Sequence, residues 1–160
     1  MSALREVHPR LFVGDLAHCQ PGTSDRAVIH ACKIPCHQRA IGYTGSLHKD
    51  HPGYLALADP HNLWLNLIDP PSPLFQLESF HAFFAFAAPR FDSGQPLLIH
   101  CNQGESRSPS LALLLLARHL HVIPYDSFSA AQAAYLRLDP AYRPGTGIAR
   151  FLAEQWSSLG

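Results

Sequence analysis

The stretch of residues 96–117, PLLIHCNQGESRSPSLALLLLA, constrains the fold more than any other part of the chain. Residues 97–99 are a short apolar run after a glycine and a proline, which predicts a buried strand. Residues 111–116 are almost entirely leucine, and a run of this length and composition favours a buried helix. We therefore expect Cys101 at the end of a buried strand and Arg107 at the start of a helix.

The loop between this strand and this helix has the features of an anion-binding site. A tight strand-to-helix loop turns backbone N–H groups inward, and the helix adds unpaired N–H groups and the positive end of its dipole. Arg107 brings a planar guanidinium that can hold two oxygens of one phosphate. Such surroundings favour the thiolate form of Cys101, which would be a nucleophile facing a bound oxyanion. Gly104 suits a loop whose backbone must approach its ligand closely.

Residues 100–108, HCNQGESRS, resemble the signature loop of the cysteine-dependent protein tyrosine phosphatase superfamily. That signature is His-Cys, five residues, then Arg and Ser or Thr, and the form Gly-x-Ser-Arg-Ser is similar to the dual-specificity branch. The resemblance implies an α/β fold with a central, mostly parallel sheet flanked by helices, as a single phosphatase catalytic domain over residues 1–160. It also implies a protein tyrosine or dual-specificity phosphatase that acts through a phosphocysteine intermediate on Cys101.

Phosphate ester hydrolysis also needs an acid, because the leaving oxygen must be protonated as its bond to phosphorus breaks. Residues 63–68 alternate large apolar groups and predict a strand that ends at Asp69, before a proline-rich segment. Asp69 stands 32 residues before Cys101, and the resemblance implies a general acid at closely similar spacing. The alternative is an aspartate that caps the next helix. Asp59 and Asp92 are less favoured rivals, since one precedes the strand and the other lies in a turn.

The resemblance extends to other residues of the loop. Ser108 resembles the hydroxyl that stabilises the departing thiolate, although Ser108 and Ser106 also suit N-cap positions. We expect His100 to order the loop by hydrogen bonding. The residues expected to contact substrate are Asn102, Gln103, Gly104, Glu105, Ser106 and Arg107.

The substrate class follows from the same loop. Its variable residues include no lysine or arginine, whereas relatives that act on phosphoinositides or RNA 5′-triphosphates usually carry extra basic residues there. Phosphotyrosine, together with phosphoserine or phosphothreonine, is therefore the expected substrate. Gly145 stands where the family commonly has an asparagine, which puts the bracing of the loop in question.

The rest of the chain predicts a simple order of elements. Strands are expected at residues 10–15 and 27–30, and a short helical turn near 54–58. A helix over 73–91 would connect the 63–68 strand to the central strand as a parallel pair. Two further helices are expected near residues 126–138 and 148–156.

The composition limits the classes of binding partner that we expect. The formal net charge is zero with histidine neutral, which gives no reason to expect nucleic acid or a membrane surface as a partner. We find no apolar signal peptide or membrane span, and a reactive Cys101 needs a reducing compartment, so we expect a cytoplasmic protein. No cofactor is expected. Two other classes stay open, namely a non-catalytic phosphoprotein-binding module and a rhodanese-like sulfurtransferase.

Residues 30–37, HACKIPCH, place two cysteines and two histidines within eight residues. This spacing differs from that of the usual paired zinc ligands, and no second pair follows, so no metal site is predicted. The simpler interpretation is a strand end and loop with partly buried thiols. A disulfide between Cys101 and either Cys32 or Cys36 under oxidation is a third hypothesis.

Overall fold

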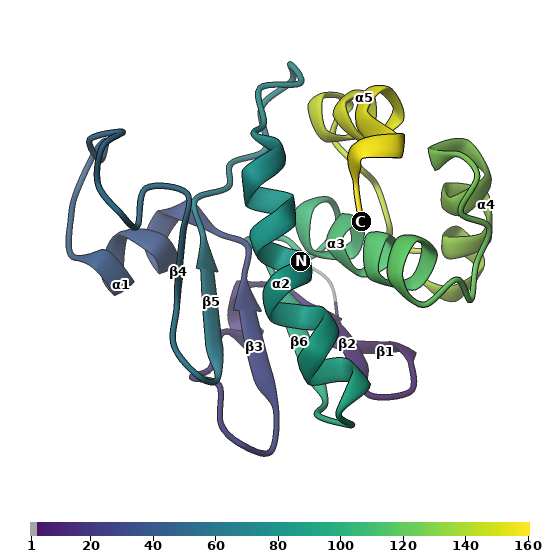
Figure 1. The fold of residues 1–160 in the computed structure, drawn as a ribbon, viewed down its shortest axis with the longest axis horizontal. Helices are drawn as coiled ribbons and strands as arrows, with labels where there is room; N and C mark the ends of the chain where they lie inside the picture. The colour runs from purple at the N-terminus through teal and green to yellow at the C-terminus, as the bar shows by residue number, and fades with distance from the viewer. Residues whose placement is uncertain (1–2) are drawn as a thin grey trace.

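A computed structural model describes residues 3–160 (Figure 1). The strands of this part of the chain are β1 (Arg5–His8), β2 (Leu11–Gly14), β3 (Ala27–His30), β4 (Ala56–Ala58), β5 (Asn62–Leu65) and β6 (Leu97–His100). The α-helices are α1 (Gln38–Ile41), α2 (Leu77–Asp92), α3 (Arg107–Leu114), α4 (Phe128–Leu138) and α5 (Thr146–Gln155). Shorter helical segments are η1 (Leu16–His18), η2 (Lys33–His37), η3 (Leu115–His119), which continues α3, and η4 (Trp156–Ser158).

All of these strands form one sheet in the order β1-β2-β6-β3-β5-β4. The inner strands β2, β6, β3 and β5 pair in parallel, and the short edge strands β1 and β4 pair antiparallel with their neighbours. Strand β6 lies at the centre and all of its residues are buried, as the apolar run at 97–99 predicts. The expected α/β class with a mostly parallel, helix-flanked sheet is confirmed.

The strand register decides which side chains share a face of the sheet, because successive residues point to opposite sides. The last paired row across the four parallel strands consists of Gly14, His100, His30 and Trp64. The residues one position earlier point the other way and belong to the main hydrophobic core: Val13, Ile99, Ile29 and Leu63. The two faces of the sheet are therefore chemically different at its carboxyl end.

Helices cover the core face of the sheet (Figure 1). Helix α2 packs on β4, β5 and β6, while α3 packs on β2 and β6, with α4 and α5 beyond it. The rings of Phe80 in α2 and Phe151 in α5 stack with centroids 5.2 Å apart, which joins the two helices. Among the described residues, no helix combines the length and apolar character that a bilayer span requires.

Several boundaries differ from those expected. The predicted helical turn near 54–58 is wrong, because residues 56–58 form the edge strand β4 against β5. Helix α2 starts at Leu77 instead of residue 73, since the prolines before it favour an extended chain, and Leu74 is left 75% exposed. Strand β5 ends at Leu65, three residues earlier than expected. Strands β5 and β6 are parallel but not neighbours, because β3 lies between them.

Candidate active site

Cys101 lies directly after β6, at the bottom of the loop that leads into α3; residues 101–106 are called the cysteine loop below. Cys101 is 2% exposed, and two polar groups contact its sulfur. The backbone N–H of Gly104 donates to Sγ at 3.2 Å, and the Ser108 hydroxyl lies 3.2 Å from Sγ. Gly104 has a φ of +73°, a left-handed conformation that favours glycine, and this conformation turns its N–H toward the sulfur.

Ser108 has one hydroxyl hydrogen and two neighbours that could accept it. Its Oγ lies 3.2 Å from the carbonyl oxygen of Gly14 and 3.2 Å from the sulfur of Cys101. When Cys101 is a thiol, its S–H donates to Oγ and Ser108 donates to Gly14. When Cys101 is a thiolate, the hydroxyl can turn and donate to the sulfur instead. Ser108 is therefore placed to respond to the charge of the sulfur, whereas no side-chain bond caps the start of α3.

Arg107, the first residue of α3, is held by hydrogen bonds from its two Nη atoms. Its Nη1 donates to the carbonyl oxygen of Leu67 and its Nη2 to Oδ1 of Asn102, both at 2.8 Å. Its Nε is buried and has no hydrogen-bond partner among residues 3–160. Because a buried donor without a partner is costly, this Nε marks a position where an acceptor oxygen would be favourable.

Asp69 is brought to the same place by the loop between β5 and α2. A cavity of about 270 Å³ is lined by Asp69, Cys101, Asn102, Gln103, Glu105, Ser106, Arg107, Arg143 and Gly145. Of the residues predicted from sequence, Gly104 and Ser108 contact the sulfur of Cys101 but do not line this cavity. Asp69 does not cap α2, whose N-cap residue is Gln76. Asp59 and Asp92 do not line this cavity, since Asp59 bonds Asn62 and Asp92 bonds His119.

The segment between α4 and α5 contacts both the cysteine loop and the loop that carries Asp69. The N–H of Arg143 donates to the carbonyl oxygen of Glu105 at 2.7 Å, and the N–H of Gly145 donates to Oγ of Ser106 at 2.8 Å. A Cβ at Gly145 would lie 2.6 Å from Oδ1 of Asp69. The glycine thus lets the carboxylate of Asp69 come close, and its N–H still braces the cysteine loop without an asparagine side chain.

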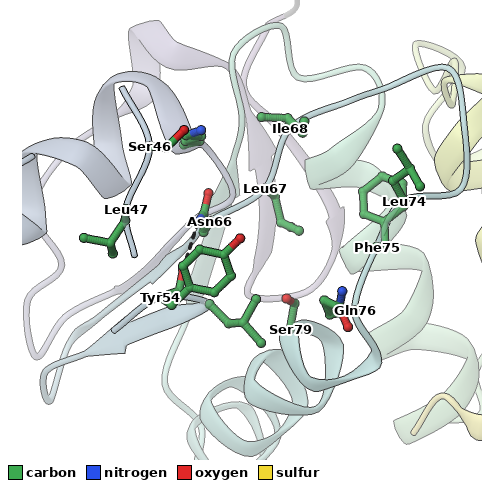
Figure 2. Close-up of a pocket in the computed structure, with 12 residues that line it drawn as sticks. Ser46, Leu47, Tyr54, Asn66, Leu67, Ile68, Leu74, Phe75, Gln76 and Ser79 are labelled. Carbon is green, nitrogen blue, oxygen red and sulfur yellow. Dashed lines mark hydrogen bonds between the residues drawn. The ribbon is translucent and has the colours of Figure 1, made fainter. Parts of the chain in front are cut away.

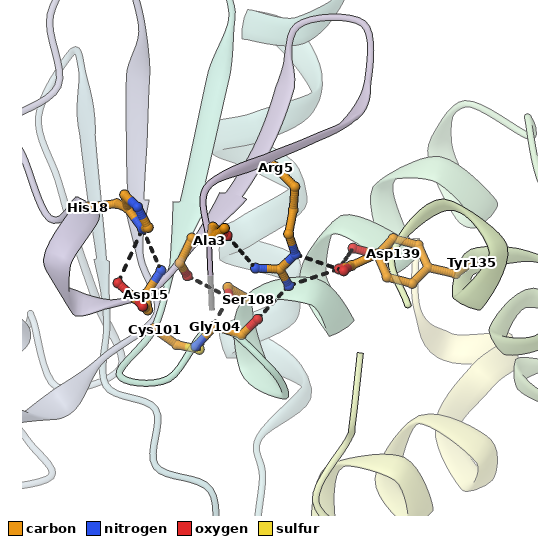
Figure 3. A network of polar contacts seen from close by, with 10 residues as sticks. Ala3, Arg5, Asp15, His18, Cys101, Gly104, Ser108, Tyr135 and Asp139 are labelled. Atoms are coloured by element: carbon orange, nitrogen blue, oxygen red, sulfur yellow. Dashed lines mark hydrogen bonds and ion pairs between the residues drawn. The ribbon is translucent and has the colours of Figure 1, made fainter. Parts of the chain in front are cut away.

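A second brace comes from the N-terminal edge of the sheet (Figure 3). Arg5 in β1 pairs with Asp139, with Nε to Oδ1 at 2.7 Å and Nη2 to Oδ2 at 2.9 Å. The same Nη2 donates to the carbonyl oxygen of Gly104 at 2.6 Å. The hydroxyl of Tyr135 also donates to Asp139, and burial, followed by the Asp139 charge, raises the pKa of Tyr135, so this donor stays protonated.

Three residues that line or brace the cavity around Cys101 were not predicted from the sequence. Arg5 and Arg143 lie far from the loop along the chain, and no local pattern identifies them; Gly145 was noticed only as a departure from the resemblance. His100, by contrast, does not line the cavity: it is fully buried on the opposite side of β6, with its Nε2 2.7 Å from Nδ1 of His30. His100 therefore lies away from the cavity, and its role in ordering the cysteine loop stays a prediction.

A second pocket, of about 200 Å³, is lined in part by Leu67 and Ile68, which precede Asp69 in the sequence (Figure 2). Tyr54, Asn66 and Ile68 line it, together with residues at the start of α2. Elsewhere in the loop between α1 and β4, Tyr43 bonds His37 and His48 is exposed. None of them lines the cavity around Cys101.

Replacing Arg5 with alanine should destabilise the protein strongly, because it leaves the fully buried carboxylate of Asp139 without its cation. Removal of one partner of a buried pair typically costs about 3–5 kcal/mol. The matched control is Arg150→Ala, which removes an exposed pair with Glu154 and should cost about 0–1 kcal/mol. Urea unfolding followed by circular dichroism measures both free energies. Equal values for the two variants would contradict a bracing role for Arg5.

Comparisons with known proteins agree with this architecture. No family model and no curated protein sequence matches the chain. Among solved structures, a single-residue variant of human DUSP28 superposes with a TM-score of 0.68 at 18% identity, over 99% of this chain and 97% of that chain. The human tyrosine phosphatase-like serine/threonine/tyrosine-interacting protein gives 0.65 at 18% identity, over 97% and 96%. The PTP-2 phosphatase of Cydia pomonella gives 0.63 at 20% identity, over 97% and 91%. The chain therefore has the fold of the dual-specificity phosphatases.

Proposed function

We propose that this chain is a cysteine-dependent protein phosphatase of the tyrosine or dual-specificity type, with one catalytic domain over residues 1–160. The observation that carries the proposal is that Cys101, Arg107 and Asp69 line one cavity. A nucleophile, an anion-binding guanidinium and an acid are the three groups that phosphoryl transfer to sulfur requires. The fold shared with phosphatases supports the same reaction.

The first step transfers the phosphoryl group to the enzyme. The phosphate enters the cysteine loop, where backbone N–H groups and Nε of Arg107 receive its oxygens. The thiolate of Cys101 attacks phosphorus in line, a sulfur–phosphorus bond forms and the bond to the leaving oxygen breaks. Asp69, protonated at this stage, gives its proton to that oxygen. Fixed donors act most strongly on the charge that develops during transfer.

The second step releases phosphate. Asp69, now a carboxylate, takes a proton from a water molecule that attacks the phosphocysteine. The sulfur–phosphorus bond breaks and the electron pair returns to the sulfur of Cys101 as a thiolate. Ser108 turns its hydroxyl from the carbonyl oxygen of Gly14 to this thiolate, which stabilises the leaving group.

Phosphorylated tyrosine is the substrate that the surroundings suit best, with phosphoserine or phosphothreonine as further possibilities. Arg143 is the only cation besides Arg107 among the lining residues, all of which lie in the described part of the chain. This is too little positive charge to favour a multiply phosphorylated ligand. The side chains of Ile34 and Ile68, whose backbones neighbour the cysteine loop and Asp69, are 59% and 50% exposed. They offer apolar surface to an aromatic ring.

Two alternatives are distinguished by experiment. A phosphoprotein-binding module is the second candidate, because one structural neighbour carries the name phosphatase-like interacting protein. A rhodanese-like sulfurtransferase is less well supported, since such a reaction has no use for Asp69 in the cavity.

We also infer a reducing, cytoplasmic environment, since Cys19, Cys32, Cys36 and Cys101 are all free within residues 3–160.

The proposal is tested by hydrolysis of para-nitrophenyl phosphate by the reduced protein. The wild type should turn over, and Cys101→Ser should fall to the background rate, because a serine hydroxyl at this site is not deprotonated. Cys32→Ser is the matched control and should stay active. No hydrolysis by the wild type, combined with retained binding of phosphotyrosine peptides, would favour the binding module. Transfer of sulfur from thiosulfate would favour the sulfurtransferase.

Asp69→Asn should slow hydrolysis of a phosphotyrosine peptide by about 10²–10⁴-fold, the usual contribution of a general acid. The loss should be smaller with para-nitrophenyl phosphate, because its leaving group needs less help from an acid. Steady-state kinetics with both substrates measure the difference, and Asp92→Asn is the control that should change neither rate. Equal losses with the two substrates would indicate that Asp69 does not protonate the leaving oxygen.

Gly145→Asn should lower kcat with little change in KM, because the new side chain would displace the carboxylate of Asp69 from its position at Gly145. The effect should disappear when Asp69 is already asparagine, since the displaced group is then no longer an acid. A double-mutant cycle of the two positions measures this coupling. Additive losses would mean that Gly145 acts on folding or on the cysteine loop instead.

A further inference from the structure

Four metal-ligating side chains converge on the face of the sheet opposite the main core. They are Cys19, His30, Cys36 and His100, and one ligand atom from each lies within 4.8 Å of all the others. Cys19 follows η1 after β2, His30 ends β3, Cys36 lies in η2, and His100 ends β6. We propose that these residues form a Zn²⁺ site, a second functional centre that is separate from the cavity around Cys101.

The ligand set and its spacing suit zinc. Two thiolates and two imidazoles are a common tetrahedral set for structural Zn²⁺, and two thiolates balance the charge of the ion. Zn–N bonds of about 2.0–2.1 Å and Zn–S bonds of about 2.3 Å require separations of about 3.3 Å between nitrogens and about 3.6 Å between nitrogen and sulfur. The separation is 2.7 Å between Nδ1 of His30 and Nε2 of His100, and 3.6 Å between that Nδ1 and Sγ of Cys19. Small movements of the side chains would admit the ion.

The partner of His30 fixes which of its nitrogens is the ligand. The amide of Asn62 donates from Nδ2 to Asp59 at 3.1 Å, which leaves Oδ1 to accept from Nε2 of His30 at 3.0 Å. Nε2 therefore carries the hydrogen, and Nδ1 of the neutral imidazole presents its lone pair to the cluster. Metal-ligating histidines usually make such an outer bond from the nitrogen that faces away from the metal. Stacking on Trp64, with ring centroids 5.2 Å apart, holds the ring in this orientation.

His100 is arranged in the same way. Its Nε2 faces His30, and its Nδ1 lies 3.4 Å from the backbone carbonyl oxygen of Cys101. His30, Cys36 and His100 are buried, whereas Cys19 is exposed. A pocket of about 540 Å³ lined by Cys19, His30, Cys36 and Trp64, among others, opens the cluster to solvent and gives an ion a path of entry.

Residues 30–37 contain four potential zinc ligands, but only His30 and Cys36 belong to the proposed site. Cys32 and His37 make hydrogen bonds elsewhere. Sγ of Cys32 donates to the carbonyl oxygen of Ile34 at 2.9 Å. The ring of His37 bonds the hydroxyl of Tyr43 and the carbonyl oxygen of Gly53. The other two proposed ligands come from outside this stretch: Cys19 follows η1 after β2, and His100 ends β6, the strand between β2 and β3.

The test is a zinc titration of the full chain, kept reduced, stripped of metal and set against a chromophoric chelator. The wild type should bind one equivalent with a submicromolar Kd. Loss of a residue that only bonds a ligand typically weakens metal binding by about 10–100-fold. Cys19→Ser and Cys36→Ser remove a ligand itself, so each should weaken zinc binding by more than this. Cys32→Ser and Cys101→Ser should bind like the wild type. Because Cys19 is exposed, its variant should fold normally, which circular dichroism checks.

Cobalt gives a second readout. Co²⁺ bound to the wild type should show the intense visible bands of tetrahedral coordination and charge transfer from thiolate, and Cys19→Ser should lose the charge-transfer intensity. Four results would each overturn the proposal. They are no stoichiometric binding by the reduced chain, equal binding by Cys19→Ser, loss of binding in Cys101→Ser, and an octahedral cobalt spectrum without thiolate bands.

Discussion

Strand β6 is hydrogen-bonded to β2 on one side and to β3 on the other, and its side chains are buried on both faces. The rest of the molecule depends on this position. A strand enclosed in this way cannot shift its register by one residue without exchanging its core and polar side chains. The end of β6 is therefore fixed, and with it the point at which the chain leaves the sheet to form the cysteine loop. Helix α3 fixes the other end of that loop, because all of its residues after Arg107 are buried.

Short loops between fixed ends still need their backbone directions set, and distant segments do this here. The connection between α4 and α5 contacts Glu105 and Ser106 through backbone N–H groups, and Arg5 contacts Gly104. Gly145 in the same connection approaches Asp69, and Gly147 in the first turn of α5 approaches Pro70. Cys101 and Asp69, the nucleophile and the acid of the proposed reaction, lie on separate loops that both contact this part of the chain. Such preorganisation is what fixed donors need in order to act on a transition state without rearranging.

Features set by residues close together in the sequence could be predicted, whereas features set by contacts between distant segments could not. The strand, the cysteine loop and α3 are encoded within about twenty consecutive residues, where hydrophobic pattern and turn chemistry act together. Asp69 was found because a strong strand pattern precedes it and because the family resemblance implies an acid at this spacing from Cys101. Strand β4 was missed because an Ala-Leu-Ala segment has no β pattern of its own and is held by its pairing with β5. Arg5 and the grouping of Cys19 with His100 depend on which strands are neighbours, which no local pattern reveals.

Gly145 and Gly147 have a consequence for how this sequence can change over evolutionary time. A side chain at 145 would meet the carboxylate of Asp69, and one at 147 would meet the backbone carbonyls of Pro70 and Ser72. A side chain at 147 requires the loop that carries Asp69 to move, whereas one at 145 requires the carboxylate of Asp69 to leave its position. The order of substitutions is therefore restricted: a change that is neutral in a relative with a displaced loop is harmful in this chain. Such dependence between positions is epistasis with a steric origin.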